Sequence, residues 1–187
     1  MRALILGRVL PALDRVGGAL GAVAMVLILG LVGVMLNEVV ARRFLNAPTI
    51  WAVDITYMAN GTLFLLGAAY TLRRNMHVRI DFLSTRLPLR VQHAANLAFY
   101  AVVFLPAMGL TAYESVLKAH RAWVRGTTEN MSVWEPVIWP FLTGIAVGVI
   151  GLTLQVAVEA VRHAFGVVDP ASVRPPGEVD QQQGAAP

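Results

Sequence analysis

The sequence predicts an all-α integral membrane protein. Of its 187 residues, 57% are hydrophobic and only 14% are charged, and the mean hydropathy is +0.63. Soluble domains are usually about 45–50% apolar. The apolar residues gather in four long runs, each long enough for the roughly 20 residues that cross a hydrocarbon core of about 30 Å. Because backbone polar groups in lipid have to be satisfied within their own segment, we expect these runs to be helices.

The four predicted spans cover residues 16–40, 51–72, 91–116 and 137–161. Their formal charges lie near span ends, where the side chains can reach the interface: Glu38, Asp54, Glu114 and Glu159. The first run follows basic residues, as in a signal peptide, but it is too long for one and has no small-residue cleavage site. We therefore expect it to be retained as a helix. Pro106 predicts a kink in the third span.

A short amphipathic helix is predicted between the second and third spans. Its apolar stripe has helical spacing: Met76, Ile80, Leu83 and Leu87. The arginines of this segment fall off the stripe, so the helix is expected to lie in the membrane interface among lipid headgroups. His77 and Asp81 are one helical turn apart. Two interpretations stay open for them: a solvated surface pair, or a polar contact with helix ends or a partner subunit.

Basic residues predict the orientation of the chain. Ten lysines and arginines flank the side that holds both termini and the amphipathic segment, and five flank the other side. The side richer in basic residues is normally cytoplasmic. We therefore expect a cytoplasmic N-terminus at 1–15, a four-helix membrane domain at 16–163 and a cytoplasmic tail at 164–187. The tail is rich in Pro, Gly and Gln, which predicts disorder.

Charged residues also predict contacts at the other side of the membrane. Glu38 precedes Arg42 by four residues, the favourable order for a helical ion pair. Asp54 lies in the first turn of the second span, where a negative charge suits the helix dipole. Arg42 or Arg43 could reach Asp54 across the short connecting loop.

Several functional classes are not supported by the sequence. It has no cysteine, and therefore no disulfide or thiolate site. It contains no Walker loop, H-E-x-x-H or G-x-S-x-G motif, so we expect no catalytic, cofactor-binding or metal residues and no enzyme activity. The basic residues lie between apolar runs, which indicates contact with the lipid bilayer rather than with nucleic acid. Four helices without a catalytic motif suggest an accessory subunit.

Three blocks of sequence carry a family resemblance: "RRFLNAPTIWAVD", "GAAYTLRRNMHVRID" with "RLP" following, and "WEPVIWPFLTGIAVG". In order and spacing they resemble the small membrane subunit (DctQ-like) of tripartite ATP-independent periplasmic (TRAP) transporters, over about residues 16–161. The resemblance marks six positions for folding or subunit contact: Arg43, Trp51, Asp54, His77, Arg79 and Asp81. The family often has two adjacent acids after the tryptophan, whereas this chain has Val53 before Asp54.

The resemblance also implies a function. In such transporters a periplasmic substrate-binding protein captures an organic acid, and a large membrane subunit moves it inward by symport with sodium. The small subunit packs against the static part of the large one in the bacterial inner membrane, and its periplasmic loops face the binding protein. The substrate would then be selected by the other subunits.

Two alternatives remain at the level of sequence. The first is a haem-bearing membrane anchor of a respiratory complex, which needs axial histidines on facing helices. His93 begins the third span and His163 follows the fourth, both at the cytoplasmic side rather than mid-membrane. The second is a stand-alone small transporter or channel.

Overall fold

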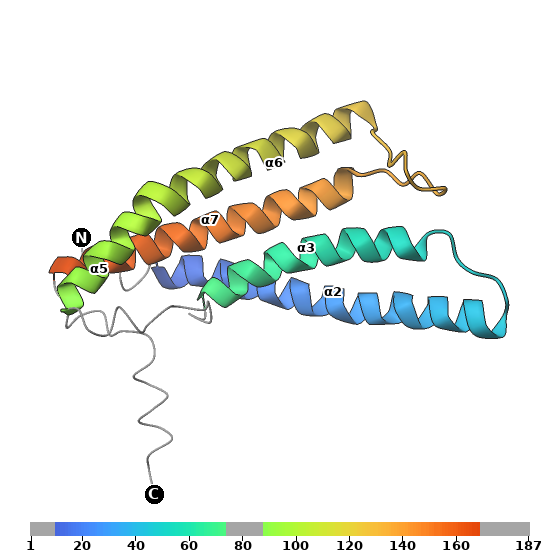
Figure 1. Ribbon diagram of the computed structural model, residues 1–187, viewed down its shortest axis with the longest axis horizontal. Helices are drawn as coiled ribbons and strands as arrows, with labels where there is room; N and C mark the ends of the chain where they lie inside the picture. Colours follow the sequence, from blue (N-terminus) through green and yellow to red (C-terminus); the bar gives the residue numbers. More distant parts are fainter. Residues whose placement is uncertain (1–9, 74–87, 169–187) are drawn as a thin grey trace, which may run out of the picture.

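The computed structural model describes residues 10–73 and 88–168. The amphipathic segment, with His77, Arg79 and Asp81, lies outside these residues. The described elements are helical: α2 (Leu10–Phe44), α3 (Ala52–Arg73), α5 (Leu89–Ala98), the π-helical η2 (Phe99–Phe104), α6 (Leu105–Arg125) and α7 (Trp139–Val168). The long helices run side by side, with α7 between α6 and α3, and α2 beyond α3 (Figure 1).

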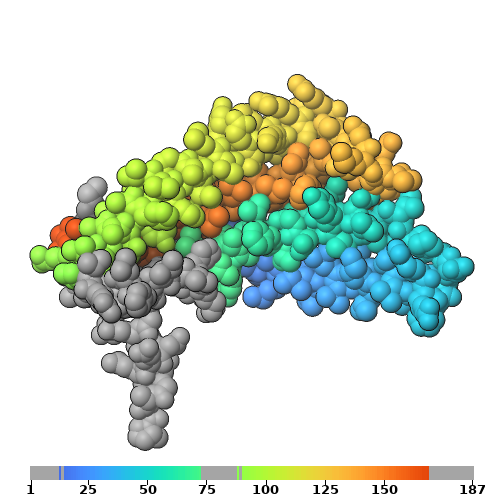
Figure 2. Space-filling view, in the orientation of Figure 1, coloured from blue at the N-terminus to red at the C-terminus, as the bar shows by residue number. Residues whose placement is uncertain are grey.

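Helix α7 forms the centre of the bundle. It contacts α2, α3, α5, η2 and α6, and the space-filling view shows it recessed between α6 and α3 (Figure 2). Of the most apolar stretch of α7, 39% is buried, against 11% for α2 and 0% for the third span. The outer helices therefore leave most of their apolar surface uncovered by this chain.

Three helices are long and apolar enough to cross a membrane in the part of the chain that the structure describes. They cover Arg15–Phe44, Arg90–Arg125 and Trp139–Val168. Together they establish an all-α, multi-pass membrane protein. Helix α3 has 22 residues and packs beside α2 and α7. It contains threonines, tyrosines and Asn60, and it is not one of these three helices.

The third span is interrupted next to Pro106. Between α5 and α6 the backbone of η2 is π-helical, and the Leu105 N–H donates to the Tyr100 carbonyl, five residues back. Pro106 then occupies the first turn of α6. Proline has no N–H to donate, so a wider turn before it accommodates the missing bond. The sequence predicted a kink at this proline, and the structure has a π-helical segment directly before it.

Glycines bring α7 close to its neighbours. A Cβ at Gly144 would lie 2.6 Å from the Thr62 side chain, and one at Gly148 would lie 2.7 Å from the Leu65 side chain. Small residues let helices in membranes approach this closely. Gly144 and Gly148 form a G-x-x-x-G motif in the sequence, and both glycines pack at the α3–α7 interface. Elsewhere on α3, Asn60 is exposed and a Cβ at Gly67 would meet nothing within 4 Å.

Helix ends differ from the expected span limits. Helix α2 begins at Leu10 rather than at residue 16, and α7 continues to Val168 rather than ending at 161. Residues 164–168, expected to belong to the tail, are helical, and Gly166 is buried against His93. The tail from 169 onwards lies outside the described residues.

Candidate functional site

The two interhelical connections that the structure describes, 45–51 and 126–138, lie at the same end of the bundle (Figure 1). This end is called the loop end, and the other is called the α5 end. The loop end holds three of the residues singled out from the sequence: Arg43, Trp51 and Asp54.

Glu38 closes the connection between α2 and α3. Its Oε1 accepts hydrogen bonds from Arg42 Nη2 at 2.7 Å and from Arg42 Nε at 3.0 Å. Its Oε2 accepts from the Thr49 backbone N–H at 3.0 Å and from the Thr49 hydroxyl. The predicted ion pair is confirmed, and the second carboxylate oxygen fixes the connection three residues before α3 begins. Arg43 lies exposed in the last turn of α2.

Asp54 contacts the α6–α7 connection instead of an arginine. The Ser132 hydroxyl donates to Asp54 Oδ2, and Ser132 Oγ accepts from the Trp134 backbone N–H at 3.1 Å. The expectation that Arg42 or Arg43 pairs with Asp54 is thus corrected, since Arg42 is engaged by Glu38. The contact ties the first turn of α3 to a residue 78 positions away. Trp51 is half-buried just before α3, and its carbonyl accepts from the Ile55 N–H.

The α6–α7 connection is itself held by backbone hydrogen bonds. Gly126 ends α6 with a φ of 58°, a left-handed conformation that favours glycine. The Glu129 N–H then donates to the Pro136 carbonyl at 2.9 Å, and the Ile138 N–H to the Thr127 carbonyl at 3.1 Å. These bonds join the two halves of the connection to each other at the loop end.

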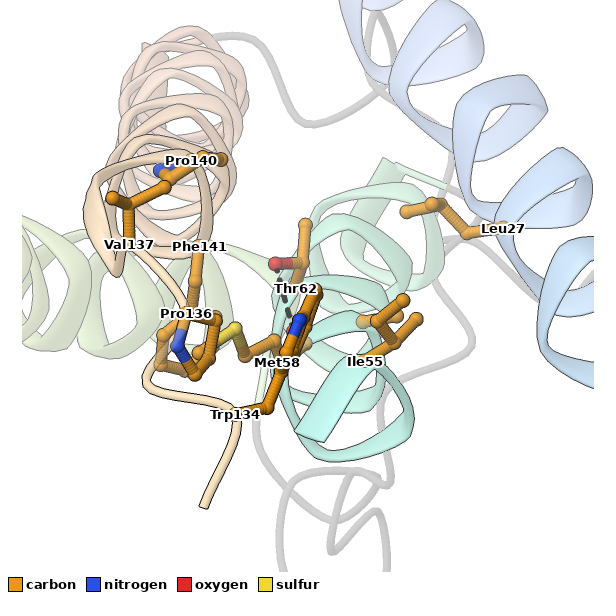
Figure 3. Close-up of a pocket in the computed structure, with 10 residues that line it drawn as sticks. Leu27, Ile55, Met58, Thr62, Trp134, Pro136, Val137, Pro140 and Phe141 are labelled. Carbon is orange, nitrogen blue, oxygen red and sulfur yellow. Dashed lines mark hydrogen bonds between the residues drawn. The ribbon is translucent and has the colours of Figure 1, made fainter. Parts of the chain in front are cut away.

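A pocket of about 430 Å³ lies between the α6–α7 connection and helices α2, α3 and α7 (Figure 3). Helix α3 contributes Ile55, Met58, Ala59 and Thr62. The connection and the start of α7 contribute Trp134, Pro136 and Phe141, and Leu27 points in from α2. The Thr62 hydroxyl donates to the Met58 carbonyl at 3.1 Å, so its hydrogen is already engaged. The pocket surface is therefore mainly hydrocarbon.

The four tryptophans of the chain all lie at the loop end: Trp51, Trp123, Trp134 and Trp139. The rings of Trp123 and Trp139 meet edge to face, with centroids 4.3 Å apart. Tryptophan is enriched where a membrane meets water. The loop end is therefore expected to lie at one membrane surface.

The α5 end contains a buried histidine pair. Nδ1 of His93 and Nδ1 of His163 are 3.0 Å apart, and each residue is only 5% exposed. Tyr100 stacks on His163 with centroids 5.7 Å apart. One Nδ1 has to donate and the other to accept. The rings bond directly to each other, so this geometry is not one in which they flank a haem from opposite sides.

Helix α7 has two further buried polar side chains, Gln155 and Glu159. Gln155 Nε2 donates to the Leu13 carbonyl of α2 at 3.2 Å, and Glu159 pairs with Arg162 at 2.7 Å. Among residues 10–73 and 88–168, no group of three or more His, Cys, Asp and Glu side chains is arranged to hold a metal ion. Sequence reasoning missed the histidine pair; its signal was that both histidines fall at the same side of the membrane.

A protein-family match covers most of the helices described above. The family model described as "Tripartite ATP-independent periplasmic transporters, DctQ component" matches residues 31–166. The sialic acid TRAP transporter small permease protein SiaQ of Vibrio cholerae is 27% identical over 90 residues, 47% of this chain and 52% of SiaQ. The sialic acid TRAP transporter permease protein SiaT of Haemophilus influenzae is 24% identical over 79 residues, 42% of this chain and 13% of SiaT.

The matched segments therefore span about half of SiaQ and a small part of SiaT. No solved structure gives a significant match.

Proposed function

This chain belongs to the DctQ component family of the tripartite ATP-independent periplasmic transporters, and from that premise we propose that it is the small permease subunit of such a transporter. The observation that carries the proposal is the extent of the family match. Residues 31–166 run from the middle of α2 almost to the end of α7, so the match includes both connections of the loop end. In this role the chain scaffolds a large membrane subunit and is not an enzyme.

The distribution of charge favours a scaffold over a transport pathway. The stretches 16–37, 55–72, 91–113 and 139–158 contain no Asp, Glu, Lys or Arg. Charged side chains within a membrane commonly mark ion or substrate pathways. The uncovered apolar surfaces of α2 and α6 offer area for lipid and for a large subunit. Translocation is therefore assigned to that partner.

The proposed process is sodium-coupled uptake of an organic acid delivered by a periplasmic binding protein. SiaQ and SiaT are named as sialic acid permease proteins, and sialic acid is an organic acid. Their names support the substrate class, and sodium coupling is carried over from the family resemblance.

The proposed topology has four spans in the bacterial inner membrane, with α3 as the second and both termini cytoplasmic. The loop end then faces the periplasm. Support comes from the smaller number of basic residues at that end. Residues 76–87 are proposed as an interfacial cytoplasmic helix and 169–187 as a disordered tail.

Six positions are proposed as structural or subunit contacts: Arg43, Trp51, Asp54, His77, Arg79 and Asp81. Arg43 is exposed, so its guanidinium can reach a partner. The Asp54 carboxylate accepts a hydrogen bond from Ser132, so its proposed role is to position the α6–α7 connection for contact with a partner.

The direct test is deletion of this chain from cells that retain the large subunit and the binding protein. Uptake should be lost and should return when the chain is supplied in trans, and gentle purification should recover it with the large subunit. Normal uptake in the deletion strain would refute the proposal. Uptake by the purified chain alone in liposomes would favour a stand-alone transporter instead.

A further inference from the structure

We propose that the pocket at the loop end binds one acyl chain of a membrane phospholipid from the leaflet on that side. The inference concerns a binding site of this chain and does not rest on the proposed transport role. It is drawn from the depth of the pocket, the chemistry of its wall and the route by which it is reached.

The pocket has the depth of one leaflet. Trp134 and Pro136 lie in the connection beyond the helix ends, whereas Leu27 lies near the middle of the apolar stretch Arg15–Phe44. On α3, Thr62 is ten residues into the helix, or about 15 Å at 1.5 Å per residue. Half of a hydrocarbon core is also about 15 Å thick. The pocket therefore follows the course of an acyl chain from headgroup level to mid-membrane.

The wall suits a hydrocarbon and not a polar substrate. The pocket volume of about 430 Å³ is typical of a small-molecule site. The Thr62 hydroxyl is engaged with the Met58 carbonyl, and the Trp134 indole is the polar group nearest to headgroup depth. A carboxylate or sugar buried here would lose hydrogen bonds to water that the wall does not replace. An acyl chain has no such groups.

Access is from the side of the bundle. Met58, Ala59 and Leu27 are half-buried, so the pocket opens on the surface of a membrane-spanning region. Lipid is the solvent at that surface. A single acyl chain is narrow and flexible, which suits a pocket of about 430 Å³ with this lining.

Asp54 positions the part of the α6–α7 connection that lines the pocket at headgroup depth. Its bond to Ser132, and the bond from the Trp134 N–H to Ser132, hold this part of the connection. Figure 3 shows the Trp134 indole beside α3. Trp134 is 42% exposed, so one part of the ring faces the pocket and another faces outward. An amphipathic ring at this depth fits the junction between an acyl chain and its headgroup.

The experiment uses the full chain in lipid nanodiscs that contain a phospholipid with a photoreactive diazirine on one acyl chain. The discs are equilibrated, exchanged against unlabelled phospholipid, and irradiated, and the labelled residues are mapped by peptide mass spectrometry. Met58 and Phe141 should keep several-fold more label than Phe64, which is 77% exposed on α3 and contacts only bulk lipid in this arrangement.

Two variants locate the signal. Ala59→Phe fills the pocket and should reduce the retained label at Met58 and Phe141 several-fold. Val53→Phe adds the same ring at a position that is 62% exposed and does not line the pocket, and it should leave the label unchanged.

Equal loss of label at Met58 and Phe64 in the parent chain would overturn the proposal, whatever the variants do. In discs holding the full transporter, a crosslink from a pocket residue to the large subunit in place of lipid would also overturn it.

Discussion

Nδ1 of His93 and Nδ1 of His163 share a hydrogen bond of 3.0 Å between α5 and α7, although the residues are 70 positions apart. The approach is possible because residue 166 is glycine. A Cβ there would lie 2.7 Å from His93 Nδ1. The pair therefore fastens the start of the third span to the central helix, and it does so with side chains that water hardly reaches.

Replacing His93 with Ala should destabilise the protein. The change removes a buried hydrogen bond and leaves a cavity, and together these should cost about 2–4 kcal/mol in unfolding free energy. Thermal unfolding of the purified protein in detergent measures the loss. His120→Ala, at an exposed position on α6, is the control and should unfold like the parent. Parent-like unfolding of the His93 variant would show that the pair contributes little.

Gly148→Ala should loosen the α3–α7 interface. The new Cβ would lie 2.7 Å from the Leu65 side chain and 3.2 Å from its backbone carbonyl carbon. Overpacking of this kind typically costs about 1–3 kcal/mol. Gly67→Ala is the matched control, because its Cβ meets nothing within 4 Å. A difference in unfolding temperature between the two variants is expected, with Gly148→Ala the lower, and its absence would contradict the packing described.

Asp54→Ala and Ser132→Ala should both release the α6–α7 connection, and Ser132→Ala should release it more because its hydroxyl also accepts from the Trp134 N–H. A hydrogen bond to a charged group is worth about 1.5–3 kcal/mol when buried, and this half-buried one is expected near or below the lower end. Limited proteolysis should cut the connection faster in each variant. Because Asp54 and Ser132 act on each other, the double variant should be cleaved no faster than Ser132→Ala. Additive effects would indicate that the two side chains act separately.

Single cysteines can test the topology, since the chain has none of its own. Val133→Cys lies in the α6–α7 connection at a position that is 89% exposed. It should react with a membrane-impermeant maleimide added to intact spheroplasts. Arg90→Cys, exposed at the α5 end, should react only after the membrane is opened. The reverse pattern would overturn the proposed orientation.

Much of the fold follows from the sequence because lipid imposes simple rules. Long apolar runs become helices, and tryptophans are enriched at membrane surfaces; in this chain all four lie at the loop end. The Glu38–Arg42 pair was predictable because its partners are four residues apart on one helix. Local spacing thus predicts local contacts.

Contacts between helices were harder to predict. In water the apolar face of a helix identifies its packing side, but a membrane helix is apolar on nearly every side. Helix α3 packs on α7 through Gly61, Thr62 and Leu65, and no apolar stripe on α3 distinguishes that side from the others. The partners of Asp54 and His93 depend on tertiary positions that spacing along the chain does not reveal.

The central place of α7 has a consequence for how the protein is made. Helix α7 contacts α2, α3, α5 and α6, and it is the last of the described helices to be synthesised. When the ribosome has completed α6, the α2–α3 hairpin can already form in the membrane, but the third span still lacks the surface on which it packs. Assembly of the bundle therefore waits for the final insertion event. A destabilising change in α7 should therefore act on biogenesis, because the earlier helices would stay exposed to membrane quality control.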